Sequence, residues 1–110
     1  MKIPADSIIP PAKLTDYLLV ERPWDDKSKF LAQADFRRDD PQSLEQAIRQ
    51  LAANADAVED GENEYGAFWR VEGDLCGPNG VRLTVVAIWL HWLADGKFHL
   101  VTLKPRKEKS

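Results

Sequence analysis

The acid–base chemistry open to this sequence begins with its two histidines, His91 and His99. An imidazole exchanges a proton near neutral pH, so either residue could serve as a general base or a general acid. Between them lies Asp95-Gly96, and an Asp-Gly pair flanked by apolar runs is the strongest short signal of a β-hairpin with a two-residue turn. On that register the two imidazoles point to opposite faces of the sheet, so they cannot share a metal ion or relay a proton directly.

The same register separates the hairpin residues into two faces and places Trp89 opposite Thr102. We expect any working surface on the face that carries His91, because that face mixes apolar bulk with an imidazole, a hydroxyl and an amine. The other face is apolar apart from His99, and we expect it to face the core: Val86, Ile88, Leu90, Trp92, Val101 and Leu103. The mixed face comprises Val85, Ala87, Trp89, His91, Leu93, Phe98, Leu100, Thr102 and Lys104.

A lysine at the start of a predicted helix is the next candidate feature. Asp25 or Asp26 supplies an N-cap, and the positive end of the helix dipole disfavours Lys27 in the first turn. Two explanations are open. Either Lys27 pairs with one of these carboxylates, or Lys27 and the backbone N–H groups of Lys27 and Ser28 bind an anion such as a phosphate. Lys29 points nearly the opposite way on this helix.

The elements that must position these residues are helices followed by strands. Helical spacing of apolar residues predicts helices over Pro11–Val20, Lys27–Ala34 and Pro41–Asp56. From Ala57 the apolar period becomes two: we expect a short strand near Val58, a solvated acidic loop over 59–64, and strands over 65–76, 81–94 and 97–104. This order predicts an α+β fold, with N-terminal helices packed on one face of a three- to four-stranded antiparallel β-meander. Residues 1–105 form one domain and residues 106–110 a basic tail.

Composition limits the classes of function. The 110 residues carry a net charge of −3, which argues against a protein dedicated to nucleic acid, although positive charge collects in the C-terminal tail. No apolar run could span a bilayer, no signal peptide is evident, and Cys76 is the single cysteine, so we expect a cytoplasmic protein. The sequence has no phosphate-binding glycine loop, dinucleotide fingerprint or metal-spaced histidine pair, and we expect no cofactor and no metal.

Six short segments, in this order, resemble a bacterial family of small uncharacterised domains that also occur as C-terminal modules of polymorphic toxins. That family is similar in layout to the barnase–EndoU–colicin–RelE group of ribonucleases. The segments are Lys13-Leu14-Thr15-Asp16-Tyr17-Leu18-Leu19, Lys27-Ser28-Lys29-Phe30, Glu64-Tyr65-Gly66, Gly77-Pro78-Asn79-Gly80, Ile88-Trp89 and Leu100-Val101-Thr102-Leu103-Lys104-Pro105.

The resemblance implies a metal-independent endoribonuclease that acts on RNA. Such an enzyme needs a base for the 2′-OH proton, an acid for the leaving oxygen, and cations or N–H groups for the charge that develops on phosphorus. We expect His91 to be the base or the acid, Lys27 to neutralise charge, and Thr102 to donate a hydrogen bond to phosphate. Substrate binding would fall to Trp89 as a stacking platform and to two lysines, Lys104 and Lys29.

The alternative is a non-catalytic interaction domain. It would pair with an immunity-like or antitoxin-like neighbouring gene product, or form a homodimer. On the mixed face, exposed Trp89, Leu93, Phe98 and Leu100 would form an apolar patch large enough to mark an interface.

Overall fold

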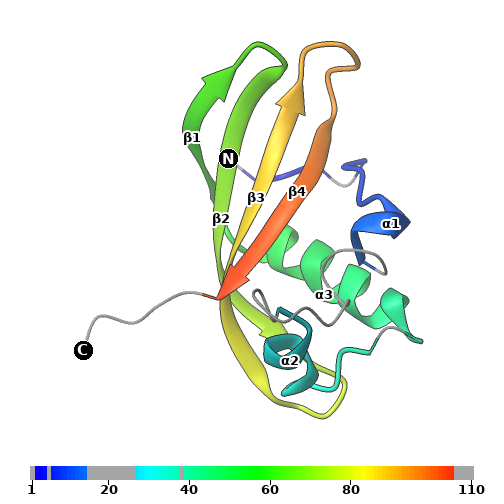
Figure 1. The fold of residues 1–110 in the computed structure, drawn as a ribbon. Coiled ribbons are helices and arrows are strands. Elements are labelled where there is room, and N and C mark those ends of the chain that lie inside the picture. Colours follow the sequence, from blue (N-terminus) through cyan, green and yellow to red (C-terminus); the bar gives the residue numbers. More distant parts are fainter. Residues whose placement is uncertain (1, 5, 15–26, 38, 106–110) are drawn as a thin grey trace.

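The computed structural model describes residues 2–4, 6–14, 27–37 and 39–105. Four strands form one antiparallel sheet in the order β1-β2-β3-β4, so each strand pairs with its neighbours in sequence (Figure 1). This confirms the predicted α+β meander. No helix in the described ranges is long and apolar enough to cross a membrane. The elements are α1 (Pro11–Lys13), α2 (Lys27–Ala32), α3 (Pro41–Asn54), β1 (Ala57–Asn63), β2 (Gly66–Cys76), β3 (Arg82–Trp92) and β4 (Phe98–Pro105).

Helix α3 forms as its sequence predicts. Pro41 occupies the first helical position, where a missing N–H costs nothing, and Asp40 precedes it at the N-cap. The Asp40 carboxylate accepts a hydrogen bond from the Ser43 hydroxyl at 2.7 Å, and no backbone N–H donates to it. Glu45 and Arg49, four positions apart on this helix, form an ion pair at 3.8 Å. One stripe of the helix is buried, as expected from its spacing: Leu44, Ala47, Ile48, Leu51 and Ala52.

The β3–β4 hairpin has a longer turn than predicted. The N–H of Trp92 donates to the carbonyl of Lys97 at 2.9 Å, so four residues, 93–96, form the loop. The N–H of Gly96 donates to the carbonyl of Trp92, and the φ of +69° at Gly96 suits a residue without a Cβ. The prediction of a two-residue turn was therefore wrong. The pairing shifts by two positions, which leaves each residue near the turn on the face that we assigned to it.

A β-bulge at Val101 then changes the faces of the rest of β4. Trp89 pairs with Leu100 and Ile88 pairs with Thr102, so Val101 is an extra residue without an opposite partner. The predicted pairing of Trp89 with Thr102 was wrong because the longer turn shifts the register by two positions, and the bulge then moves Thr102 to the opposite face. Beyond the bulge, Leu103 joins the face of Trp89, whereas Thr102 lies on the opposite face.

The expected core face and the expected working face are exchanged in the structure. Trp89 has 0% of its surface exposed and belongs to a buried core that also contains side chains of α3 and of the preceding segments. Helix α3 runs across the lower part of the sheet (Figure 1), and Leu51 lies so close to Gly73 of β2 that an added Cβ would meet its Cδ1 at 2.6 Å. We call this covered side the inner face: Val71, Leu75, Leu83, Val85, Ala87, Trp89, Phe98, Leu100 and Leu103.

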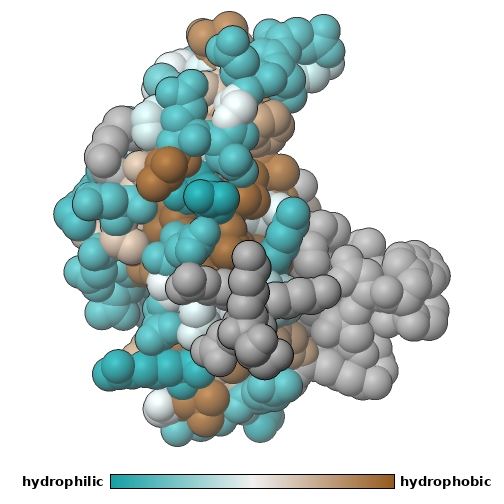
Figure 2. Space-filling view, turned by 90° about the vertical axis from the view of Figure 1, so that its left-hand side faces the viewer, coloured by the Kyte–Doolittle hydropathy of each residue, from teal (hydrophilic) through white to brown (hydrophobic). Residues whose placement is uncertain are grey.

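The opposite side, which we call the outer face, is half-exposed. Alternation along the paired strands gives its members: Phe68, Arg70, Glu72, Val86, Ile88, Leu90, Trp92, His99, Thr102 and Lys104. Figure 2 looks at the molecule from the left of Figure 1, away from α1 and α2. It shows hydrophobic residues gathered in the middle of this side, with hydrophilic ones around them.

The two edges of the sheet are formed by segments that the sequence assigned differently. The N-terminal segment forms a bridge to β4. The N–H of Ile8 donates to the carbonyl of Phe98 at 2.7 Å, and the N–H of Leu100 donates to the carbonyl of Ile8 at 2.9 Å. Ile3 and Ile9 are buried, so this segment packs into the core. At the other edge, the acidic run that we expected to be a loop is strand β1, paired with β2 and exposed along its length after Ala57.

Candidate functional site

A histidine–carboxylate pair lies on the outer face at the turn of the β3–β4 hairpin. Nε2 of His99, at the start of β4, lies 2.7 Å from Oδ2 of Asp95 in the loop. The loop fixes the carboxylate, because its Oδ1 accepts the backbone N–H of Lys97 at 2.9 Å. This backbone hydrogen bond, followed by the hydrogen bond and charge of His99, lowers the pKa of Asp95 below its ordinary 3.8. Asp95 is therefore ionised at neutral pH and faces the imidazole as an anion.

The hydrogen bond to Asp95 determines which ring nitrogen of His99 can accept a proton. A carboxylate only accepts, so Nε2 carries a hydrogen and the lone pair of a neutral ring lies on Nδ1. The imidazole also packs against the indole of Trp92, with ring centroids 4.8 Å apart at an angle of 31°. Trp92 is 39% exposed, so its free surface is open to a ligand. A proton acceptor and an aromatic surface thus lie side by side on the outer face.

Polar residues continue along the outer face of β4. Thr102 pairs with Ile88 and Lys104 with Val86, which places both on the side of His99. At the rise of a β-strand, Thr102 lies about 10 Å from His99 along the chain. On β2, Nε of Arg70 lies 3.2 Å from Oε1 of Glu72, so that guanidinium already has a partner.

The predicted site residues are not brought together. His91 pairs with Phe98 of the inner face, stacks on its ring with centroids 4.3 Å apart, and places Nε2 3.0 Å from the carbonyl of Gly96. Thr102 and Lys104 lie on the other side of the sheet. The side chains of Lys27 and Lys29, at the start of α2, lie outside what the structure describes.

Trp89 cannot be the stacking platform that we expected. It is fully buried, and its indole Nε1 has no hydrogen-bond partner, as is also true of the Nε1 of Trp69 opposite it on β2. The apolar patch expected for a dimer fails for the same reason, because Phe98 and Leu100 are buried with Trp89. Only Leu93 of that patch is exposed.

Sequence reasoning passed over His99 and Asp95, although a signal was present. We used Asp95 only as a turn former and placed His99 on the buried face. Aspartate in a turn commonly accepts a backbone N–H two residues on, which leaves its second oxygen free for a side chain that begins the next strand. A histidine four positions after that aspartate is such a side chain.

Comparisons with known proteins agree with the fold. A family model described as Domain of unknown function (DUF6883) matches residues 5–107. No protein with a curated description matches the chain in sequence. Among solved structures, a chain of a contact-dependent growth inhibition toxin–immunity protein complex from Klebsiella pneumoniae 342 superposes with a TM-score of 0.68 at 19% identity. The match covers 91% of this chain and 100% of that one, so the two share a fold over nearly their whole length.

Proposed function

Since this chain belongs to the DUF6883 family of domains of unknown function, we propose its function from its own geometry: it is a toxin-related domain that cleaves RNA on the outer face of its sheet. The observation that carries the proposal is the His99–Asp95 pair, which lies against a half-exposed indole on an open sheet surface. Its fold likeness to a chain of a toxin–immunity complex supports the toxin-related part.

The proposed reaction is transfer of the RNA phosphodiester to its own 2′ oxygen. Nδ1 of His99 takes the proton of the 2′-OH, and the oxygen forms a bond to phosphorus. The bond from phosphorus to the 5′ oxygen breaks, and that oxygen takes a proton from water, giving a 2′,3′-cyclic phosphate and a 5′-OH end. The imidazolium of His99 then returns its proton to the hydroxide that remains. The Asp95 carboxylate stabilises the imidazolium as it forms, since the two groups lie 2.7 Å apart.

Two other residues of the outer face would position the substrate by binding phosphates that flank the cleaved one. Lys104 supplies positive charge, and the Thr102 hydroxyl can donate a hydrogen bond to a phosphate oxygen. Trp92 takes over the role that we first gave to Trp89, as a surface on which a base stacks, an interaction worth about 1–3 kcal/mol per base. The proposal therefore keeps Thr102 and Lys104 from the sequence prediction and moves the proton acceptor from one side of the sheet to the other.

A matched pair of histidine variants tests this assignment. We expect the purified protein to cleave single-stranded RNA in the presence of EDTA, and His99→Ala to lower the rate about 100-fold. His91→Ala is the control, because His91 lies on the other side of the sheet with Phe98. Loss of cleavage in His91→Ala with retention in His99→Ala would reverse the assignment and restore the sequence prediction. Intact RNA with the wild-type protein would refute the nuclease proposal itself.

A second candidate function is binding of a protein partner, favoured by the apolar surface in the middle of the outer face. Val58 is 55% exposed, and Phe68, Val86 and Ile88 are half-buried on the same side. The similar solved chain was determined in a complex of a toxin with its immunity protein. A partner of that kind would cover this surface and, if the first proposal holds, block the cleavage site.

The product of a neighbouring gene, mixed with this chain, tests the second function. Light scattering should show a one-to-one complex, and Ile88→Glu should weaken it by about 30-fold or more, as expected for a central interface residue. Val81→Glu, at an exposed position in the β2–β3 turn, is the matched control and should leave affinity unchanged. A homodimer disrupted by Ile88→Glu would make the partner a second copy of the chain. A monomer that binds no neighbouring product would refute this function.

A further inference from the structure

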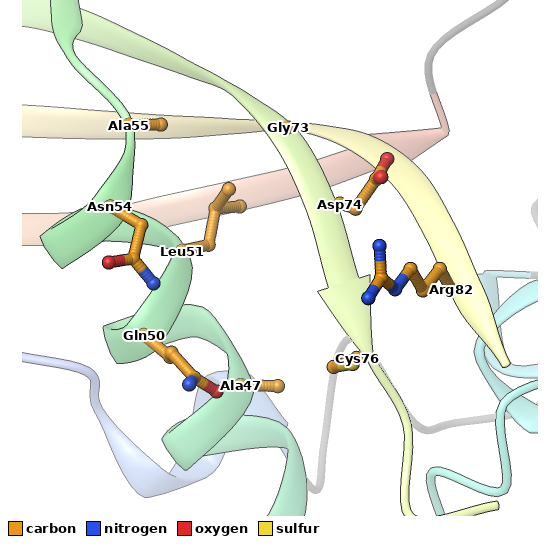
Figure 3. Close-up of a pocket in the computed structure, with 9 residues that line it drawn as sticks. All are labelled: Ala47, Gln50, Leu51, Asn54, Ala55, Gly73, Asp74, Cys76 and Arg82. Carbon is orange, nitrogen blue, oxygen red and sulfur yellow. The ribbon is translucent and has the colours of Figure 1, made fainter. Parts of the chain in front are cut away.

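A groove of about 340 Å³ lies between helix α3 and the paired ends of β2 and β3 (Figure 3). Its volume is within the range of small-molecule sites. One wall belongs to α3, and the other to β2 and the start of β3. The residues that line it are Ala47, Gln50, Leu51, Asn54, Ala55, Gly73, Asp74, Cys76 and Arg82.

The α3 wall carries two carboxamides, Gln50 and Asn54. They are four positions apart on one helix, so both lie on the same side, one turn apart, as Figure 3 shows. Both side chains are exposed, and neither is hydrogen-bonded to another described residue. Each carboxamide offers one acceptor oxygen and an NH₂ donor within a single plane. This is the side-chain group that pairs in a bidentate manner with adenine, accepting from N6 and donating to N7.

The strand wall carries opposite charges in a fixed arrangement. The Asp74 carboxylate accepts a hydrogen bond from the Thr84 hydroxyl at 2.8 Å through Oδ1, so Oδ2 remains for a ligand hydroxyl. Arg82 is exposed and forms no ion pair with any described carboxylate, and its guanidinium lies over the end of β2 in Figure 3. A guanidinium without a partner matches the two oxygens of a phosphate.

The floor between these walls is apolar. Gly73 has no side chain, and an added Cβ there would meet Cδ1 of Leu51 at 2.6 Å. Leu51 and Ala47 are buried beneath the groove, and Ala55 is half-buried at its end. Leu51 therefore fills the space over Gly73, and a planar ring can lie beside it, against Leu51 and Ala55, with its edge toward the carboxamides of α3.

We propose that this groove binds an adenine nucleotide. The base lies against Leu51 and Ala55 with its N6 and N7 edge paired to Asn54 or Gln50, the ribose hydroxyl donates to Asp74, and the phosphate pairs with Arg82. A purely apolar ligand would leave the two carboxamides and the guanidinium unused. A plain anion would not use the apolar floor. The inference rests on the groove alone and is independent of whether the outer face cleaves RNA.

Binding can be measured by calorimetry with AMP, and the single cysteine of the chain reports where the ligand lies. Cys76 is exposed and lines the groove, so bound AMP should slow its alkylation by iodoacetamide. We expect Asn54→Ala and Arg82→Ala each to weaken AMP binding about tenfold. Arg82→Ala should leave the weaker binding of adenosine unchanged, because adenosine has no phosphate.

Two matched controls accompany these variants. Gln42→Ala removes an exposed carboxamide from the first turn of α3, outside the groove, and Arg37→Ala removes an exposed guanidinium that pairs with Asp35. Both should bind AMP as the wild-type chain does. All four variants alter exposed side chains, and circular dichroism checks that they fold. Absence of AMP binding, equal binding of AMP, GMP and UMP, or alkylation of Cys76 at an unchanged rate would each overturn the proposal.

The source of the nucleotide is settled by comparing AMP with a short oligo(dA), which the proposed cleavage reaction cannot degrade because it lacks a 2′-OH. Binding of AMP without binding of the oligonucleotide makes the ligand a free nucleotide. Binding of both, with the same dependence on Asn54 and Arg82, makes it one residue of a chain. Because neither measurement requires cleavage, a negative result here leaves the nuclease proposal intact, and the reverse also holds.

Discussion

The two faces of the β3–β4 hairpin carry similar residues, but one face is buried and the other is partly exposed. Each has a tryptophan on β3 and a histidine nearby. On the inner face, Trp89 is completely buried and His91 stacks on buried Phe98. On the outer face, Trp92 is 39% exposed and His99 is held by a carboxylate. The difference arises from the layer above the sheet and not from the hairpin itself, because residue type and alternation are alike on both sides.

The faces also differ in whether their polar side-chain atoms have hydrogen-bond partners. The buried indoles of Trp69 and Trp89 keep an N–H without a hydrogen-bond partner, which lowers stability relative to a satisfied group. On the outer face, Asp95 satisfies the backbone of the loop and the imidazole together. The outer face is therefore the better location for a reactive site, because water and ligands can reach its polar atoms.

The largest difference that we expect between the faces is in stability. Trp89→Ala removes a fully buried indole from the core, so it should lower the free energy of unfolding by about 3–5 kcal/mol. Trp92→Ala removes a half-exposed ring and should cost about 1 kcal/mol. Urea unfolding followed by circular dichroism measures both. Trp89→Phe, which keeps most of the buried ring and removes the unpartnered N–H, gives a folded variant should Trp89→Ala not fold. Equal losses for Trp89 and Trp92 would contradict the assignment of faces.

A smaller effect is expected from deleting Val101, the bulge residue that separates Leu100 from Thr102. In the observed pairing this residue has no opposite partner, so the deletion leaves Thr102 opposite Ile88 and Leu103 in the core. The free energy of unfolding should change by less than about 2 kcal/mol.

In the variant that lacks Val101, the reactivity of an introduced cysteine shows whether its position on β4 lies on the inner or the outer face. With Cys76 replaced by serine, a cysteine at position 102 should react with a water-soluble reagent, whereas one at position 103 should be protected. A strand that paired without a bulge would show the reverse, because losing one residue turns all later side chains to the other face.

The smallest effect concerns pH. The pKa of Asp95 is lowered in the folded chain, chiefly by the N–H of Lys97, so the carboxylate stabilises the fold above its ordinary pKa of 3.8. This contribution is lost as pH falls through the lower, folded value. Asp95→Asn should therefore flatten the acid limb of a plot of thermal midpoint against pH between about pH 5 and pH 2. An unchanged acid limb would show that the loop does not depend on this carboxylate.

Local features of the fold could be predicted from sequence. The start and the buried stripe of α3, the packing of the N-terminal isoleucines and the turn at residues 77–80 all follow from residue type and spacing. The N–H of Gly80 donates to the carbonyl of Gly77 at 3.0 Å, as a tight turn requires. For the candidate site, Thr102 and Lys104 lie on the open face, although the register that led to them was wrong. Residues 15–20 of the helix predicted over Pro11–Val20 fall outside the described residues.

Other features could not be predicted from local pattern. The acidic run 59–63 has the composition of a loop, yet pairing with β2 makes it a strand. Its edge carries charge, which discourages pairing with further chains. The length of the hairpin turn escaped prediction because Asp-Gly also ends a four-residue loop, with Asp95 binding the N–H of Lys97.

The sequence by itself determined that this chain alternates two kinds of side chain along a hairpin, since strand geometry places neighbours on opposite sides. It could not determine which side is covered, because both are apolar enough to be buried. Only the tertiary structure decided that, through α3 packing over Gly73 and through one unpaired residue, Val101, which returns Leu103 to the core and leaves Thr102 outside. Burial is decided by contacts between segments distant in sequence, and a pattern read along one segment does not contain them.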